Sequence, residues 1–227
     1  MDVNTVNGNC NLILLTDIEI RKSWMALQNE KKPIDDKQEF GPIFARLYSL
    51  FASRSGKHKA VYSKILEDMV SMNPSSILEM GSGPGIAAAI IAQKLPGTKI
   101  TCVDPSTTMV KIANQRFEEL SLAPRVKSEL GESSKFVTTE KFDLIFSSLS
   151  YHHWRNGKQD LQELARKYLP AGTLIIYENF IQNEDGAKSV KHHHGIGLND
   201  IESMEIPGFK KTYEIGDKLV RVKFSNI

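Results

Sequence analysis

A glycine-rich segment follows a short apolar run in the first half of the chain. Residues 75–85 read Ser-Ser-Ile-Leu-Glu-Met-Gly-Ser-Gly-Pro-Gly, and an apolar helical pattern begins at Ile86. Glycine reaches backbone conformations that are closed to other residues, and it lets a ligand approach the main chain closely. A helix that follows such a turn offers free N–H groups at its first turn. The segment therefore predicts a strand, a ligand-binding turn and a helix.

An acidic residue, Asp104, stands nineteen residues after Gly85, at the end of a second apolar run. In nucleotide-binding folds an acid at about this spacing holds a ribose diol. The glycine spacing departs from the dinucleotide pattern G-x-G-x-x-G, because Ile86 occupies the position of the third glycine. Glu79, two residues before the first glycine, opposes a pyrophosphate and suits a cationic ligand. A nicotinamide-binding domain is therefore the disfavoured alternative.

Apolar runs alternate with amphipathic patterns from Ser75 onward. This order predicts an α/β fold with a Rossmann-like, doubly wound and mostly parallel sheet, and the last two strands are expected to form an antiparallel hairpin. The expected strands are 77–80, 99–104, 125–130, 142–147, 173–180, 209–213 and 219–224, and the expected helices include 86–95, 158–169 and 199–204. Another helix is expected after an N-cap at Ser106, with Met109, Ile112, Ala113, Phe117 and Leu120 on its inward face.

The length of 227 residues favours one domain with a small appendage. We expect an N-terminal extension over residues 1–39 and a single domain over residues 40–227, which begins with a helical lid over residues 40–72. The inward positions expected late in the lid are Val61, Ile65, Leu66, Met69 and Val70. Tyr62 is expected to pack in the core of the lid, with the lining of a pocket as the alternative.

Composition excludes few functions. The net charge of +2 and the pI of about 8.4 do not argue for a nucleic-acid partner. No apolar run approaches the roughly 18 residues of a membrane span, and the two cysteines, Cys10 and Cys102, make no disulfide framework. We expect a cytoplasmic protein with no membrane partner, and composition does not indicate an oligomeric state.

The pattern E-x-G-x-G-x-G from Glu79 to Gly85 resembles the first motif of class I methyltransferases that depend on S-adenosylmethionine (SAM). The motif order from Ile77 to Phe180 is similar to small-molecule members of that family, such as the ubiquinone/menaquinone-biosynthesis type. The resemblance implies SAM as cofactor, S-adenosylhomocysteine (SAH) as product and a small molecule as methyl acceptor. The residues that it implies for cofactor binding are Glu79, Gly81, Ser82, Gly83, Gly85, Asp104, Pro105, Ser106, Glu132, Ser133, Ser147 and Ser148.

The resemblance also implies a role for each of these positions. The main chain of 81–85, with Glu79, would hold the methionine part of SAM, and Asp104 would accept hydrogen bonds from both ribose hydroxyls. Pro105 and Ser106 would line the adenine and ribose, and residues 147–150 would cross beneath the sulfonium.

Glu132 would take the adenine amino group, although the family more often has an aspartate there. Three alternatives stay open: Asp104 as a turn residue, Glu132 as a surface acid, and Glu79 in an ion pair with Arg54 or Lys57.

The loop after the fourth expected strand reads Ser147-Ser-Leu-Ser-Tyr-His-His-Trp154, and in this fold it faces the reactive methyl. Histidine removes protons near neutral pH, so His152 and His153 are candidate bases. Tyr151 and Trp154 would form an aromatic wall. The alternative is that a histidine only packs against or caps the next helix. The loop has no Asn/Asp-Pro-Pro-Tyr/Phe motif, which argues against amino methylation of adenine, cytosine or glutamine, and no cysteine for methylation of a pyrimidine carbon.

The three histidine side chains of the run His192–His194 cannot converge on one point from a regular element. We therefore predict a solvated loop there, with acceptor contact as an alternative and no metal site.

An RNA or protein methyltransferase is the alternative enzyme. A SAM-binding module without transfer activity is the alternative outside enzymes.

Overall fold

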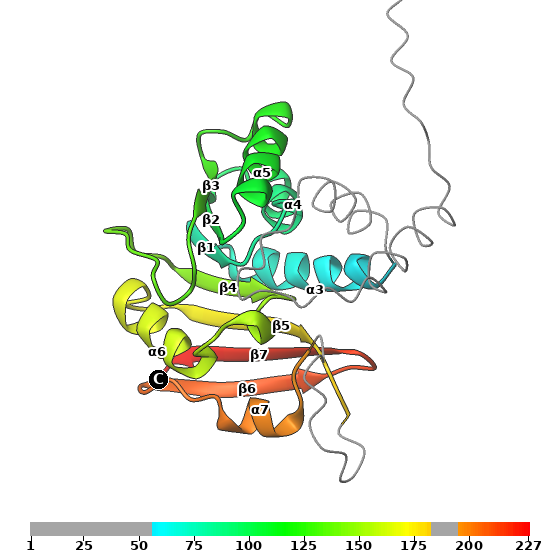
Figure 1. Cartoon of the computed structure of the whole chain (residues 1–227), viewed down its shortest axis with the longest axis vertical. Helices are drawn as coiled ribbons and strands as arrows, with labels where there is room; N and C mark the ends of the chain where they lie inside the picture. Colours follow the sequence, from blue (N-terminus) through cyan, green and yellow to red (C-terminus); the bar gives the residue numbers. More distant parts are fainter. Residues whose placement is uncertain (1–55, 183–194) are drawn as a thin grey trace, which may run out of the picture. The chain divides into compact units, whose positions relative to one another are not determined.

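The computed structural model describes residues 56–182 and 195–227 (Figure 1). The predicted N-terminal extension, residues 40–55 of the predicted lid and the run His192–His194 lie outside these residues. The boundary expected near residue 39 therefore stays a prediction.

Seven strands of the described part form one mixed sheet in the order β3-β2-β1-β4-β5-β7-β6 (Figure 1). The first five strands along the chain pair in parallel, whereas β7 pairs antiparallel with both β5 and β6. This arrangement confirms the Rossmann-like fold and the antiparallel C-terminal hairpin. The strands are β1 Ser76–Met80, β2 Lys99–Asp104, β3 Val126–Leu130, β4 Leu144–Ser148, β5 Thr173–Asn179, β6 Phe209–Ile215 and β7 Leu219–Asn226.

The helices also follow the expected order. They are α3 Gly56–Met72, α4 Ile86–Lys94, α5 Thr107–Glu119, α6 Gly157–Tyr168 and α7 Leu198–Ser203, with a short 3₁₀ turn, η1, at Tyr151–His153. The side chain of Ser106 caps α5 as predicted, because its Oγ accepts a hydrogen bond from the Met109 main-chain N–H at 3.4 Å.

Two apolar layers cover the two faces of the sheet. One layer joins α3, α4 and α5 to side chains such as Ile77, Ile100 and Phe146. The other joins α6 and α7 to Leu78, Ile145 and neighbouring positions. Because successive side chains of a strand point to opposite faces, Ile77 and Leu78 belong to different layers. A sheet buried on both faces explains the continuous apolar runs in the sequence.

Two predicted inward positions were wrong. Val70 is 43% exposed, because the buried stripe of α3 runs through Val61, Ile65 and Met69 at four-residue spacing. Leu120 is 41% exposed, because α5 ends at Glu119 and the chain turns so that Leu122 enters the core instead.

Candidate functional site

The glycine turn between β1 and α4 uses the backbone freedom for which glycine is required. Gly81, Gly83 and Gly85 have φ angles of 73°, 52° and 71°, all in the left-handed region. The main-chain N–H groups of Gly81 and Ser82 donate to the Val103 carbonyl oxygen, at 2.7 and 3.1 Å. The turn is thereby tied to the end of β2, which carries Asp104.

Asp104 braces this turn with its carboxylate. Its Oδ2 accepts a hydrogen bond from the Gly83 N–H at 2.7 Å, and its Oδ1 accepts one from the Ser106 N–H at 2.9 Å. Burial raises the pKa of the Asp104 carboxyl, and these two N–H donors act in the opposite direction. The described structure therefore gives Asp104 the turn role that the sequence left open. Each carboxylate oxygen can accept more than one hydrogen bond, so the ribose role is compatible with it.

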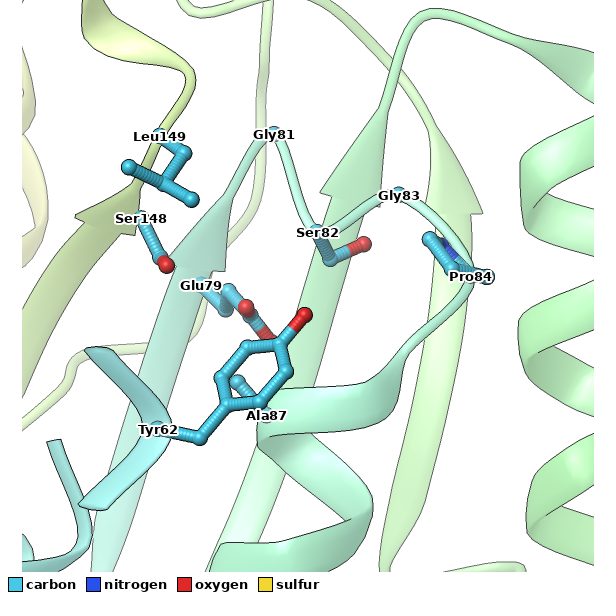
Figure 2. A pocket seen from close by; sticks show the side chains of 9 residues that line it. All are labelled: Tyr62, Glu79, Gly81, Ser82, Gly83, Pro84, Ala87, Ser148 and Leu149. Carbon is cyan, nitrogen blue, oxygen red and sulfur yellow. The ribbon is translucent and has the colours of Figure 1, made fainter. Parts of the chain in front are cut away.

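A pocket of about 50 Å³ opens between β1, the glycine turn and α3 (Figure 2). The side chains of Glu79 and Tyr62 both point into this space (Figure 2). Tyr62 packs against the core, as predicted, and it also lines this pocket. The lining residues are Tyr62, Glu79, Gly81, Ser82, Gly83, Pro84, Ala87, Ser148 and Leu149.

Glu79 is the buried acid of this pocket. Its side chain lies beside Cys102, its register partner on β2, and the Cys102 Sγ donates to Glu79 Oε2 at 3.6 Å. Burial raises the pKa of Glu79 to about 8, and the nearby Asp104 carboxylate adds to this rise. The carboxyl is therefore neutral near pH 7 and ionises readily if a cation enters. The alternative ion pair of Glu79 with Arg54 or Lys57 involves side chains outside the described part.

In charge, these residues suit the cationic amino-acid end of SAM. A Cβ added to Gly83 would meet no atom of the described residues within 4 Å, so within this part of the chain the outer face of the turn is open. Glu79 supplies a carboxyl for an ammonium group, and α4 begins directly after the turn. The same features fit a pyrophosphate poorly, because two acids border the turn.

The remaining predicted cofactor residues have varied positions. Pro105 is exposed, and Gly85 is the N-cap of α4. Ser147 is fully buried in β4 and does not line the pocket, whereas Ser148 does.

The positions predicted to bind adenine lie at the end of β3. Glu132 is exposed and forms an ion pair with Lys135 at 3.2 Å, while Ser133 Oγ donates to Asp160 Oδ2 at 2.6 Å. No contact of the described chain tests the adenine role of Glu132, which stays a prediction.

The loop after β4 rests on the glycine turn. A Cβ added to Gly81 would overlap the Ser150 side chain, and Leu149 takes a φ of 53° as the chain leaves the sheet. Beyond Ser150, Tyr151 and His152 border a second pocket of about 520 Å³. Trp154 also lines it and packs on Tyr151 at a ring-centroid distance of 5.2 Å, as the predicted aromatic wall requires.

The two candidate bases have different surroundings. His153 is exposed, and its ring lies 3.9 Å from that of His152 between centroids. His152 is 9% exposed, and its Nδ1 lies 2.8 Å from Oε2 of the fully buried Glu178. Sequence reasoning missed Glu178. The available signal was its place at the carboxyl end of β5, where Glu79 and Asp104 also end their strands.

Comparison with known proteins bears on this geometry. The family described as "Methyltransferase domain" matches residues 78–176, from β1 to β5. This segment is a class I, SAM-dependent methyltransferase domain. The family predicted from the E-x-G-x-G-x-G motif and its cofactor type are thereby confirmed.

Individual relatives of the methyltransferase domain carry different acceptors in their names. Over 100 residues the chain is 31% identical to tRNA1(Val) (adenine(37)-N6)-methyltransferase of a Flavobacteriaceae bacterium (strain 3519-10), covering 44% of this chain and 43% of that protein. Over 116 residues it is 24% identical to demethylmenaquinone methyltransferase of Thermotoga maritima, covering 51% and 48%. The chain thus spans less than half the length of these two curated relatives.

Among solved structures, a SAM-dependent methyltransferase from Aquifex aeolicus superposes with a TM-score of 0.64 at 18% identity. The match covers 83% of this chain and all of that one, and it supports the fold of the methyltransferase domain. Within the described residues, no helix is long and apolar enough to cross a membrane, and no cluster of three metal-ligating side chains occurs.

Proposed function

We propose that the chain transfers a methyl group from SAM to a small-molecule acceptor. The observation that carries the proposal is the pair of buried acids, Glu79 and Asp104, on either side of the open glycine turn. Their spacing suits a ligand with a cationic amino-acid end and a ribose. When bound, SAM supplies an electrophilic methyl on a sulfonium.

The described residues would bind and orient the reactants. The main chain of the glycine turn and Glu79 hold the amino-acid end, and Asp104 receives the ribose hydroxyls while it keeps the turn in place. The loop after β4 places Ser148 and Leu149 on the cofactor side and Tyr151 and His152 beside the second pocket. Such positioning is the main source of rate enhancement in a direct displacement.

The size and lining of the second pocket support a small acceptor. It has a volume of about 520 Å³, within the range of small-molecule sites. Aromatic, amide and charged groups line it, including Trp154, Asn156 and Asp200. The loop also lacks the Asn/Asp-Pro-Pro-Tyr/Phe motif of amino methylation. An RNA or protein acceptor remains the alternative, because one of the relatives is named for a tRNA.

Calorimetric titration of the ligand-stripped full chain with SAM, SAH and NAD tests the cofactor. We expect micromolar binding of SAM and SAH and no heat from NAD. Binding of NAD alone would overturn the proposal.

SAH release from labelled SAM then tests the acceptor. The assay uses small-molecule, RNA and protein fractions of a cell extract, each offered separately. Turnover only with the RNA or the protein fraction would favour the alternative enzyme, and turnover with none would favour a SAM-binding module.

A further inference from the structure

Strand β6 forms one border of the sheet, and within the described part of the chain it pairs only with β7 (Figure 1). The N–H of Gly216 donates to the Leu219 carbonyl oxygen at 2.8 Å, and the N–H of Ile227 donates to the Gly208 carbonyl oxygen at 3.3 Å. Hydrogen-bonded pairs alternate along an antiparallel ladder, so the even-numbered residues of β6 bond to β7. The odd-numbered residues from 211 to 215 therefore direct their main-chain groups toward the open border.

This border lacks most of the features that protect edge strands. Edge strands of natural proteins are usually blunted by proline, a bulge, short length or charged side chains. Strand β6 pairs with β7 over seven residues without interruption and contains no proline. The Lys211 Nζ donates to three main-chain carbonyl oxygens at the end of α7, so its charge is occupied within the chain. Tyr213 and Ile215 are 45% and 42% exposed, which adds apolar surface beside the open main chain.

The charges of β6 are complementary to the same strand read in reverse. Lys210 and Glu214 stand at equal distances on either side of Thr212, and alternate side chains of a strand share one face. Lys210 is exposed and forms no ion pair with another described residue. Glu214 pairs with Arg221, but its side chain is 60% exposed, so its carboxylate can receive a second cation.

We propose that two copies of this chain pair antiparallel through β6, about a two-fold axis at Thr212, and so join their sheets into one. In this register Lys210 lies opposite the partner's Glu214, and the symmetry forms the same ion pair twice. Lys211 and the partner's Tyr213 form a hydrogen-bonded pair, which exchanges both main-chain hydrogen bonds. A two-fold interface requires a surface that is complementary to itself, and the charges around Thr212 meet this requirement.

Other registers fit less well. An axis at Lys211 would set the two copies of that lysine directly opposite each other, and like charges in this position are destabilising. An axis at Tyr213 would set Lys210 opposite the partner's Gly216 and form no ion pair. An axis between two residues would place main-chain groups that point outward opposite groups that point inward. Among these registers, the one centred on Thr212 combines hydrogen bonding with charge pairing.

Sedimentation velocity of the full chain over a range of concentrations tests the association. We expect a reversible equilibrium between monomer and dimer. Lys210→Glu sets two acids opposite each other at both ends of the interface, so it should weaken association by about tenfold or more. Addition of Glu214→Lys to that variant should restore the dimer. Lys111→Glu makes the same charge change at an exposed position of α5 and is the matched control, and melting temperatures verify that each variant folds.

Cross-linking tests the position of the axis. Directly opposite residues of an antiparallel pair have Cβ atoms roughly 5 Å apart, close enough for a disulfide after a small adjustment. Thr212→Cys in a Cys10→Ser chain, treated with oxidised glutathione, should therefore run as a covalent dimer on a non-reducing gel. Cys102 is buried and should not react. Asp217→Cys, at the exposed turn between β6 and β7, is the control and should stay monomeric.

Two results would overturn the inference. The first is a monomer at every concentration, which would leave this border to a strand of another protein. The second is a dimer that Lys210→Glu leaves intact and that Thr212→Cys does not cross-link, which would place the interface elsewhere. Neither measurement requires SAM or an acceptor, so the outcome is independent of the proposed methyl transfer.

Discussion

The Ser150 side chain occupies the space that a side chain at Gly81 would need. This contact joins the loop after β4 to the glycine turn after β1, so two segments nearly seventy residues apart in the sequence form one surface around the site. Gly81 is therefore constrained twice, by its left-handed φ of 73° and by the residue packed against it.

We expect Gly81→Ala to destabilise the fold by about 3 kcal/mol, from the cost of the left-handed conformation and of overpacking. SAM binding should fall with it, as urea denaturation and calorimetry would measure. Ser150→Gly, added to Gly81→Ala, should recover the part of the stability loss that comes from overpacking. The part that comes from the left-handed backbone should remain. Gly97→Ala is the control, because its Cβ meets nothing within 4 Å and its φ lies outside the left-handed region. Equal stability of the Gly81 and Gly97 variants would contradict the assignment.

Asp104→Ala should weaken SAM binding by about ten- to a hundredfold, the loss expected for charge-assisted hydrogen bonds. The same change removes the acceptor for Gly83 and Ser106, so the free chain should also melt at a lower temperature. Asp104→Asn keeps one oxygen acceptor, so its SAM affinity and melting temperature should lie between those of the natural chain and those of Asp104→Ala. Asp217→Ala, at the exposed turn before β7, serves as the control. Unaltered affinity in Asp104→Ala would refute the ribose contact.

The neutral form of Glu79 makes stability depend on pH. Its pKa in the folded chain is about 8 against 4.5 for the ordinary group, so between these values the native state holds a proton that the unfolded state has lost. Stability should therefore fall as pH rises from 4.5 to 8, by about 1.4 kcal/mol per pH unit at most. Urea denaturation of the natural chain and of Glu79→Gln at several pH values measures this contribution by difference. If the unfolding free energies of the two chains changed in parallel with pH, Glu79 would be ionised throughout this range.

The same carboxyl should release a proton when a cationic ligand binds. Near pH 6.5 the free chain holds Glu79 neutral, and an ammonium group in the pocket favours the carboxylate. Calorimetry in two buffers of different ionisation enthalpy counts the protons released. We expect about one per SAM and none for adenosine. SAM should release none in Glu79→Gln, and a release that persists there would assign the proton to another group.

Arg221 holds a second network, away from the pocket. It pairs with Asp68 of α3 and with Glu214 of β6, while the Tyr177 hydroxyl donates to Asp68 at 2.7 Å. Asp68 is only 12% exposed, so Arg221→Met leaves a largely buried carboxylate without its cation. We expect a loss of about 2–3 kcal/mol in unfolding free energy. Arg166→Met, which breaks an exposed pair with Glu163, should leave the free energy of unfolding nearly unchanged.

The sequence predicted the fold well because burial on both faces leaves continuous apolar runs. The runs ending at Met80 and Asp104 mark β1 and β2, and the glycines between them require a turn. The errors lie where a helix face or a helix end decides the outcome. Met69 and Val70 are apolar neighbours, and the packing of α3 along its Val61–Ile65–Met69 stripe places only the first in the core.

The site was predictable where one chain segment contains the chemistry and hidden where distant segments meet. Glu79 and Asp104 follow from local patterns. The pairing of His152 with Glu178 joins η1 to β5, twenty-six residues apart, and no local spacing encodes it. Likewise, the sequence could not show that Ser133 donates to Asp160.

A single short segment serves both pockets. Ser148 and Leu149 line the smaller one, Tyr151 and His152 line the larger one, and Ser150 between them lies against Gly81. Any ligand that shifts this segment from one side must alter affinity on the other, and thermodynamic linkage makes the effect equal in both directions. The two substrates should therefore bind cooperatively, and residues 148–152 would carry the coupling between their pockets.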